Sequence, residues 1–330
     1  MAISKLESAF ISGVSPLGRT WLCLLPSLGP HMNPFLACVV LLLVAPLAVS
    51  AQGIGTLTFR EGPLRVIRGT RMLQGAEGMR LQAGDIVESS EPGFAQLEFA
   101  GGTILALGPS TQVLLLRHSA GRGGSGDRLT SEIVLLTGWL KGEIASTLGA
   151  YRCATPMMAV TTKGGTVLLR ATAQSAEAFL ESGSGNVSQV TAEGGLGSSV
   201  TAPPGQFLWR RSGKNISSSP RPDPAFVQSM PQAFRDTLPS RLSRFTGKPV
   251  EPKPDHEVSY GEIESWLSIA PAWRRGFVER FQPRLKDPEF RKAVDAHLAR
   301  HPEWDPVLHP EKYQPSPPPA TAGSSVPRGR

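Results

Sequence analysis

Residues 55–116 constrain the fold of this 330-residue chain most strongly, because short apolar runs alternate there with turn-forming residues. The apolar positions are Leu57, Phe59, Leu64, Val66, Ile67, Ile86, Val87, Phe94, Leu97, Phe99, Ile104, Leu105, Leu107 and the run from Val113 to Leu116. They are separated by Glu61-Gly62-Pro63, Arg68-Gly69, Ala83-Gly84-Asp85, Glu91-Pro92-Gly93, Ala100-Gly101-Gly102 and Gly108-Pro109-Ser110. Gly provides positive φ angles and Pro fixes φ at turns. Turns that recur roughly every 8 to 12 residues predict many short antiparallel strands.

A second series of strand-like runs lies between residues 129 and 209. The candidates are residues 133–136, 139–144, 151–154, 159–162, 166–171, 176–180 and 206–209. The link between the two series contains Gly121, Gly123 and Gly126 in the spacing of a dinucleotide-binding loop. Because a β-patterned run follows instead of a helix, we interpret this link as a flexible connector.

Ordered motifs within both series resemble the FecR domain, a bacterial cell-envelope module known from regulators of iron-siderophore uptake. In the first series they are Gly55, Arg65-Val-Ile-Arg68-Gly69, Leu81-Gln-Ala-Gly84-Asp85-Ile86, Ala95-Gln-Leu-Glu-Phe99, Gly102-Thr-Ile-Leu-Ala-Leu107 and Gly108-Pro-Ser-Thr111. In the second they are Gly138-Trp-Leu-Lys-Gly142, Ala154-Thr155-Pro156, Lys163-Gly-Gly165-Thr166 and Pro204-Gly205-Gln206. The family usually has a basic residue directly before its Gly-Thr pair, whereas Gly164 separates Lys163 from Gly165 here.

The resemblance implies a mainly β fold, either an elongated β-solenoid-like stack or an open β-sandwich, followed here by a small helical C-terminal segment. Such a stack requires inward apolar residues from successive turns to form one continuous core. Regulators of the family place a cytoplasmic anti-sigma segment and a transmembrane helix before this domain. Residues 1–31 are too short for that segment, so we do not transfer direct control of a sigma factor to this chain.

The N-terminal region predicts export. Residues 35–49 are apolar throughout, and Val49-Ser50-Ala51 supplies small side chains where a signal peptidase cuts. We therefore expect residues 1–51 to be a signal peptide, with Met32 as an alternative start, and the mature protein to be periplasmic. The apolar run is shorter than the roughly 20 residues of a spanning helix. A retained helix, which would anchor the chain in the inner membrane facing the periplasm, is the alternative.

The cysteine content and the distribution of charge limit the kinds of partner that we expect the protein to bind. Only Cys153 follows residue 51, and a single thiol cannot close an internal disulfide, so we expect a small buried side chain. The net charge of +7 is spread along the chain and not gathered into one tract. We therefore expect an envelope protein or a cell-wall polymer as partner, no nucleic acid, and a membrane only if the N-terminal helix is retained. The oligomeric state is left open.

The five candidate binding residues are Arg65, Arg68, Asp85, Trp139 and Trp209. Arg65, Arg68 and Asp85 could line a polar ligand face, together with the charged side chains of Glu98 and Arg170. The alternative is that these charges occupy solvent-facing strands and turns, with Asp85 capping backbone N–H groups. Trp139 and Trp209 could stack on a sugar, or they could simply pack in the core or at its rim.

The residues after the predicted β domain (52–211) divide by composition. Residues 212–258 are rich in Pro and predict a linker that wraps the domain, with at most one short helix between 225 and 244. Residues 259–305 predict a small helical segment, which begins with a capping box at Ser259 and Glu262, continues in a helix over 271–281, and ends with a helix from Asp287. Residues 306–330 predict a disordered tail.

The sequence predicts a non-catalytic protein without a cofactor. It contains no nucleophile–base pair, paired carboxylates or metal-ligand cluster of a recognisable spacing. His297 and His301 lie four residues apart, but Pro302 follows and no third ligand is fixed, so we predict no metal site. The leading hypothesis is an exported recognition or scaffold module that binds through an exposed sheet face or an edge strand. The alternatives are a membrane-anchored signalling relay and a peptidoglycan or carbohydrate binder.

Overall fold

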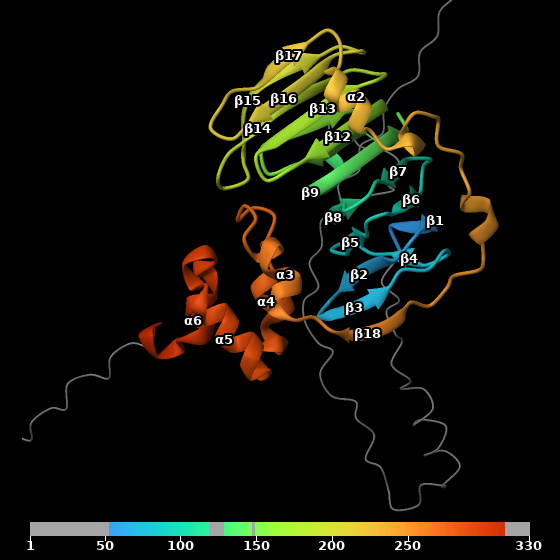
Figure 1. The fold of residues 1–330 in the computed structure, drawn as a ribbon. Helices are drawn as coiled ribbons and strands as arrows, with labels where there is room; N and C mark the ends of the chain where they lie inside the picture. Colours follow the sequence, from blue (N-terminus) through green and yellow to red (C-terminus); the bar gives the residue numbers. More distant parts are fainter. Residues whose placement is uncertain (1–52, 119–128, 147–148, 314–330) are drawn as a thin grey trace, which may run out of the picture. The chain divides into compact units, whose positions relative to one another are not determined.

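The computed structural model describes residues 53–118, 129–146 and 149–313, and their fold is mainly β with short helices near the C-terminus (Figure 1). The first strands are β1 (Gly55–Glu61), β2 (Leu64–Arg68), β3 (Arg71–Gln74), β4 (Arg80–Leu81), β5 (Ile86–Ser89), β6 (Phe94–Phe99), β7 (Ile104–Leu107) and β8 (Gln112–His118). They are followed by β9 (Leu129–Ile144), β10 (Ala150–Ala154), β11 (Met158–Thr162), β12 (Gly165–Ala171), β13 (Ser175–Leu180), β14 (Gly185–Val190), β15 (Leu196–Ala202) and β16 (Phe207–Arg211). The last strands are β17 (Ser217–Ser219) and β18 (Lys253–Glu257).

These strands form one continuous 18-stranded sheet, which curls so that two halves pack against each other. Sheet A has the order β17-β16-β13-β12-β9-β7-β6-β1-β4. Sheet B has the order β18-β3-β2-β5-β8-β9-β10-β11-β14-β15. Each of these neighbouring pairs is antiparallel except β9 and β10. The expectation of a mainly β fold with a small helical segment is confirmed.

Strand β9 joins the two halves because it bends at Gly138. Its N-terminal part pairs with β8 up to Thr137, and its C-terminal part pairs with β12 from Gly138 onward. Gly138 has a φ of 95°, and a Cβ at this position would lie 2.3 Å from Oγ1 of Thr111. Only Gly fits such a backbone without a clash. The sequence predicted two separate strands here, and the structure replaces them with one bent strand.

A single apolar core fills the space between the two halves. Leu57, Leu97 and Leu105 enter it from sheet A, whereas Val66 and Val87 enter it from sheet B. Each of these side chains is fully buried. The strict alternation along each strand therefore leaves a second set of side chains on the outer faces of the sheets.

Cys153 lies in this core, as the sequence predicted. Its side chain is 2% exposed and makes no disulfide. Burial raises the pKa of the Cys153 thiol to about 12. The thiol is therefore protonated at neutral pH and behaves as a small apolar side chain.

The C-terminal segment forms short helices. The α-helices are α3 (Tyr260–Leu267), α4 (Phe277–Phe281), α5 (Pro288–Ala296) and α6 (Asp305–Leu308). The 3₁₀-helices between and after them are η3 (Gln282–Lys286), η4 (Leu298–Arg300), η5 (Pro302–Trp304) and η6 (Pro310–Tyr313). The predicted capping box forms, because the carboxylate of Glu262 accepts the backbone N–H of Ser259 at 2.8 Å. The predicted helix over 271–281 begins only at Phe277, because Gly276 has a φ of 82° and interrupts helical geometry.

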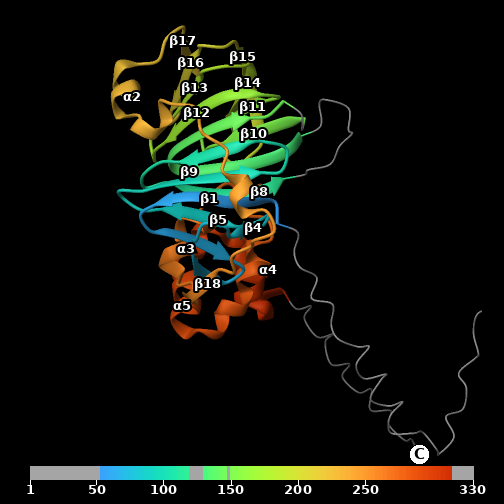
Figure 2. The same cartoon turned by 90° about the vertical axis from the view of Figure 1, so that its right-hand side faces the viewer.

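These helices cover the outer face of sheet B (Figure 2). Ile67, Ile86 and Leu114 project from that face, and Trp266 and Phe281 pack in the same buried cluster. All five side chains are fully buried. A helical set of this size is too small to form an independent core, so burial against sheet B supplies much of its stability.

Arg280 ties the helices to the sheet through backbone groups. Its guanidinium donates hydrogen bonds to the carbonyl oxygens of Ile67 at 2.9 Å, Gly69 at 2.8 Å and Gly84 at 2.7 Å. Burial lowers the pKa of Arg280 to about 10, although the charge of Asp85 acts in the opposite direction. The guanidinium therefore stays charged at neutral pH and uses its donors on three backbone carbonyls of sheet B and its turns.

A second segment covers the outer face of sheet A. We call residues 224–245 the strap. It contains α2 (Pro224–Ser229) and the 3₁₀-helices η1 (Gln232–Phe234) and η2 (Leu242–Phe245). Phe226, Phe234 and Leu238 of the strap are buried in one cluster with Trp139 and Phe207 of the sheet. The Pro-rich segment thus supplies a cover for sheet A in addition to the strands β17 and β18.

Some sequence predictions fall outside the described residues. These are the signal peptide or anchor in residues 1–51, the glycine spacing at Gly121, Gly123 and Gly126, and residues 314–330 of the predicted tail. The prediction of a disordered tail is wrong for residues 306–313, which lie mostly in α6 and η6. In the part of the chain that is described, none of the helices has the length and apolar content needed to cross a bilayer.

We predict that replacing Arg280 will loosen the helices from sheet B. Arg280→Ala leaves three carbonyls without their charged donor, and we expect the free energy of unfolding to fall by at least about 2 kcal/mol. Urea unfolding followed by tryptophan fluorescence measures the change. Arg275→Ala removes an exposed arginine of the same segment and should change stability by less than about 0.5 kcal/mol. Equal effects of the two substitutions would contradict the docking role of Arg280.

Candidate functional site

Arg68 and Asp85, two of the candidate binding residues, bind each other. Nε and Nη2 of Arg68 donate to Oδ1 and Oδ2 of Asp85 at 2.9 and 2.7 Å. Asp85 also accepts the backbone N–H of Gln82 at 2.8 Å, which confirms the interpretation of Asp85 as a turn-capping residue. Only 1% of Asp85 is exposed. The pair therefore holds together the turns on which Arg280 docks.

Arg65 lies on the same strand as Arg68 and pairs with a buried carboxylate. Its Nη2 donates to Oε2 of Glu88 at 2.8 Å, and Nε2 of Gln112 donates to Oε1 of the same group at 3.0 Å. Burial raises the pKa of Glu88, and the charge of Arg65 opposes that shift. Arg65 keeps 52% of its side chain exposed, so its partner leaves part of the guanidinium accessible to solvent.

Trp139 lies on the outer face of sheet A beneath the strap. Its ring centroid is 5.0 Å from that of Phe226 and 6.4 Å from that of Phe234. The guanidinium of Arg170 lies over the same indole, 5.2 Å from its centroid. Only 8% of Trp139 is exposed, so its main contacts are with the strap.

Trp209 lies on the same outer face and keeps part of its ring accessible. It stacks on Phe207 with centroids 5.6 Å apart, and Phe207 in turn contacts Phe226 at 5.0 Å. The two tryptophans are thus joined by a continuous row, Trp139–Phe226–Phe207–Trp209, which we call the aromatic row. The structure brings these two candidates together on sheet A and leaves Arg65, Arg68 and Asp85 on sheet B.

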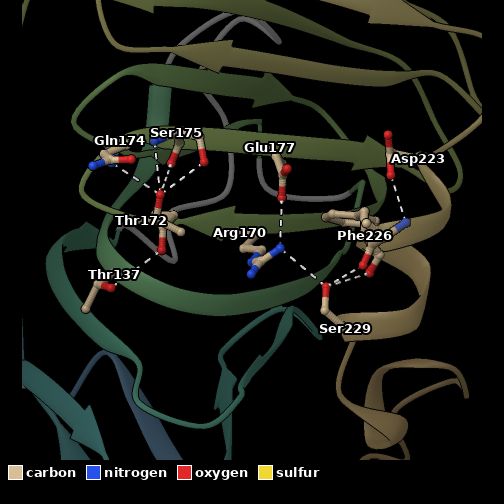
Figure 3. A network of polar contacts seen from close by, with 11 residues as sticks. Thr137, Arg170, Thr172, Gln174, Ser175, Glu177, Asp223, Phe226 and Ser229 are labelled. Carbon is tan, nitrogen blue, oxygen red and sulfur yellow. Dashed lines mark hydrogen bonds and ion pairs between the residues drawn. The ribbon is translucent and has the colours of Figure 1, made fainter.

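A polar network links Arg170 on the outer face of sheet A to α2, the helix that carries Phe226 (Figure 3). Nη1 of Arg170 lies 3.5 Å from Oε2 of Glu177 and 3.3 Å from Oγ of Ser229. Ser229 in turn donates to the carbonyl of Ala225 at 2.7 Å, and Asp223 accepts the N–H of Ala225 at 2.7 Å. The network connects Arg170 of β12 to the last residue of the helix, while Asp223 caps the first turn.

The middle of the strap is anchored by two charged residues of β9. Nζ of Lys141 donates to the carbonyl oxygens of Phe234 at 2.9 Å and Asp236 at 2.8 Å. Oε1 of Glu143 accepts the backbone N–H of Leu238 at 2.8 Å. Lys141 is 2% exposed, so its ammonium replaces water contacts with strap carbonyls.

The end of the strap is anchored by Glu98 of β6. Its carboxylate accepts hydrogen bonds from Oγ of Ser240 at 2.6 Å, the N–H of Arg241 at 2.7 Å and Oγ1 of Thr58 at 2.7 Å. Burial acts to raise the pKa of Glu98, but these hydrogen bonds outweigh it and hold the pKa below its ordinary value. Glu98 was one of the charges expected to face a ligand or solvent, and its partners are in the strap.

Later parts of the chain therefore cover both outer faces of the sheet. The edge strands are the other places where the sheet can expose backbone groups. Three edges carry protection of the kind found in natural sheets. Strand β4 has two residues, β17 has three, and β18 contains Pro254 and four charged or ionisable residues. Strand β15, at the outer edge of sheet B, has seven residues and contains neither a charge nor a proline.

Strand β15 is open along nearly its whole length (Figure 1). It pairs with β14 on one side, and six of its seven residues are exposed. Val200 pairs with Val187, so both side chains lie on the inner face of sheet B. Val187 is fully buried, whereas Val200 is 41% exposed, because no further strand covers it. The apolar row of the inner face thus reaches the edge and ends in solvent.

The sequence did not predict β14 or β15. Residues 196–202 read Leu-Gly-Ser-Ser-Val-Thr-Ala and lack the apolar alternation of a half-buried strand. Leu196, at the other end of the strand, is 43% exposed. A signal was nevertheless present, since an uncharged β-compatible run without proline is the composition of an unprotected edge.

Comparison with known proteins found partial similarity to solved structures. Two crystal structures of a candidate anti-sigma factor from Parabacteroides distasonis ATCC 8503, at 1.65 and 2.50 Å, each share 12% sequence identity with this chain. Their TM-scores are 0.33 over 41% of this chain and 59% of that chain, and 0.35 over 44% and 64%. The chain therefore spans less than two thirds of the length of those structures. No protein-family model and no curated protein sequence matches the chain.

We predict that Glu98 stabilises the closed strap in its ionised form. Glu98→Gln places an amide N–H₂ where donors converge, and we expect the free energy of unfolding at pH 7 to fall by about 1–3 kcal/mol. Because the folded pKa of Glu98 is lowered, its contribution is complete above the ordinary carboxyl value of 4.5 and is lost as the pH falls through the folded pKa. The difference between the wild type and Glu98→Gln should therefore shrink in acid.

Urea unfolding at neutral and acidic pH tests this prediction. Glu251→Gln is the control, because Glu251 is exposed and should show little difference at any pH. A Glu98→Gln difference that stays constant or grows in acid would contradict the stabilising role of the carboxylate.

Proposed function

We propose that this chain is a non-catalytic, exported cell-envelope protein that recognises an extended segment of a partner protein at the β15 edge. The observation that carries the proposal is the unprotected state of this strand, seven uncharged residues with one side unpaired. An edge of this kind offers backbone N–H and C=O groups to an incoming strand.

Strand addition at this edge would extend both the hydrogen-bond ladder and the apolar core. An incoming residue opposite Val200 would lie on the inner face, beside the row that begins with Val187. Residues on either side of it along the incoming strand would face outward, next to Ser199 and Thr201. The partner segment should therefore alternate apolar and small polar residues over about five positions.

The covered faces favour the edge over a sheet face as the recognition surface. On sheet A the strap is held by Lys141, Glu143 and Glu98, and on sheet B the helices are held by Arg280. A partner that used either face would first have to displace these contacts. A partner that adds a strand to β15 displaces only water.

The proposed location and family rest on the sequence. The apolar residues 35–49 followed by Val49-Ser50-Ala51 favour export, and the ordered glycine and strand motifs favour a FecR-like domain. A membrane-anchored signalling relay remains the alternative if the N-terminal helix is retained. The mature N-terminus discriminates between the two, since Gln52 at the front indicates a released protein.

We predict that a charge at the edge will abolish partner capture without unfolding the protein. Val200→Lys introduces the protection that natural edge strands use. A photocrosslinking residue at Ser199, in cells that produce the full chain, should trap one defined partner, and Val200→Lys should eliminate that product. Val227→Lys changes a residue of similar exposure on α2 and should leave the product unchanged.

The same experiment identifies the class of partner. A crosslinked peptide with the expected alternation, paired with β15, supports the proposal. A crosslinked second copy of this chain, or a product that survives Val200→Lys, contradicts it. If the trapped protein is an inner-membrane regulator and residues 1–51 are retained, the relay replaces the released recognition module.

A further inference from the structure

A cleft on the outer face of sheet A includes side chains of the aromatic row and of the network that holds α2, together with two arginines that neither of them uses. It has a volume of about 560 Å³ and lies between β13, β16 and β17 on one side and the residues that lead into α2 on the other. Ser175, Glu177, Phe207, Trp209 and Arg211 contribute from the sheet. These residues share the outer face, because Ser175 pairs with Arg211 and Glu177 pairs with Trp209 in adjacent strands.

The floor of the cleft is aromatic. Phe207 is 2% exposed and supports Trp209 through nearly parallel ring planes, which differ by 25°. One face of the indole is therefore fixed by Phe207, and the residue remains partly accessible. A rigid, half-exposed indole is a platform for a flat apolar surface such as the C–H face of a sugar ring.

The two carboxylates of the cleft, those of Glu177 and Asp223, already interact with other groups of the protein. Glu177 pairs with Arg170 at 3.5 Å, and Asp223 accepts the backbone N–H of Ala225 at 2.7 Å (Figure 3). These interactions fix Asp223 at the start of α2 and keep Glu177 beside Arg170, although Oε2 of Glu177 makes no hydrogen bond among the described residues. They also offset negative charge that would repel an anionic ligand.

The two arginine side chains of the cleft make no such short contacts with the residues that the structure describes. Within the described part of the chain, both arginines are exposed and their guanidinium groups donate no hydrogen bond. Burial raises the pKa of Glu177, and the charges of Arg170 and Arg211 oppose that rise, so Arg211 already attracts one carboxylate of the cleft. Each guanidinium can present a planar pair of N–H donors to a carboxylate. The cleft thus combines an aromatic platform, two available cations and the hydroxyl groups of Ser175 and Ser219.

We propose that this cleft binds an acidic saccharide, with a sugar ring on Trp209 and its carboxylate between Arg211 and Arg221. Ser175, Ser219 and Glu177 line the same cleft and can bind sugar hydroxyls. The volume accommodates a short oligosaccharide and lies within the range of ordinary ligand sites. The inference goes beyond the recognition of a protein at β15, since the cleft is on sheet A and β15 is at the edge of sheet B.

Calorimetric titration of the full chain with defined sugars tests the proposal. The probes are a uronate oligosaccharide, a muramic-acid-containing disaccharide and a neutral oligomer of N-acetylglucosamine, with inorganic phosphate as a simple anion. We expect one acidic saccharide to bind at least about tenfold more tightly than the neutral oligomer, and the binding to weaken as salt is added. The first two probes distinguish an acidic polysaccharide from a cell-wall source.

Variants locate the binding in the cleft. Arg211→Gln combined with Arg221→Gln should weaken binding of the acidic saccharide at least about tenfold. Arg244→Gln combined with Arg275→Gln removes the same charge from exposed positions outside the cleft and should have no effect. Trp209→Ala should abolish binding, and thermal melting verifies that the variant is folded.

Three outcomes would overturn the inference. They are equal binding of the acidic and neutral sugars, equal loss in both pairs of arginine substitutions, and binding of phosphate as tight as that of the saccharide. None of these outcomes would affect the β15 experiment, because Val200→Lys changes β15 whereas the arginine substitutions change residues of the cleft.

Discussion

The structure depends on one constraint. A curled sheet that carries apolar residues on both outer faces is stable in water only when other segments cover both faces. Ile67, Ile86 and Leu114 project outward from sheet B, and Phe207 and Trp139 project outward from sheet A. Left in water, these surfaces would oppose folding and promote association. The chain covers them with its own C-terminal residues, so the β region and the segments after it form one cooperative unit. Among the strands of the described residues, β15 is then the edge that lacks protection.

Polar contacts decide where each cover lies, and apolar burial supplies most of the driving force. Arg280 donates to three carbonyls of sheet B, while Glu98 and Lys141 bind backbone groups of the strap. Such contacts are directional, and a shifted strap or helix would leave a buried charge unpaired. Apolar contacts between Phe226 and the aromatic row tolerate small shifts, so they cannot fix the register alone. The charged residues therefore specify the arrangement that the apolar residues stabilise.

The local signals of the sequence predicted much of the fold, because turns and alternation act over a few residues. The strands near Leu57, the capping box at Ser259 and the buried Cys153 followed from such signals. The covering contacts could not be predicted, since Glu98 and Arg241 are 143 residues apart and alternation alone marks Glu98 as outward-facing. Strand β15 was missed for a different reason, namely that an edge strand with both faces open has no apolar periodicity to detect. Trp209 was found by residue type, but the position of Arg221 beside it emerges only from the folded structure.

Hydrogen–deuterium exchange on the purified monomer tests most directly whether the covered faces and the open edge are properties of the free protein. We expect the amides of Leu238 and Arg241 to be protected by their carboxylate acceptors, and alternate amides of β15 to exchange much faster than those of β14. Rapid exchange throughout residues 224–245 would show that the strap does not cover sheet A. Uniform protection of β15 would show that its edge is already paired, and either result would contradict the account.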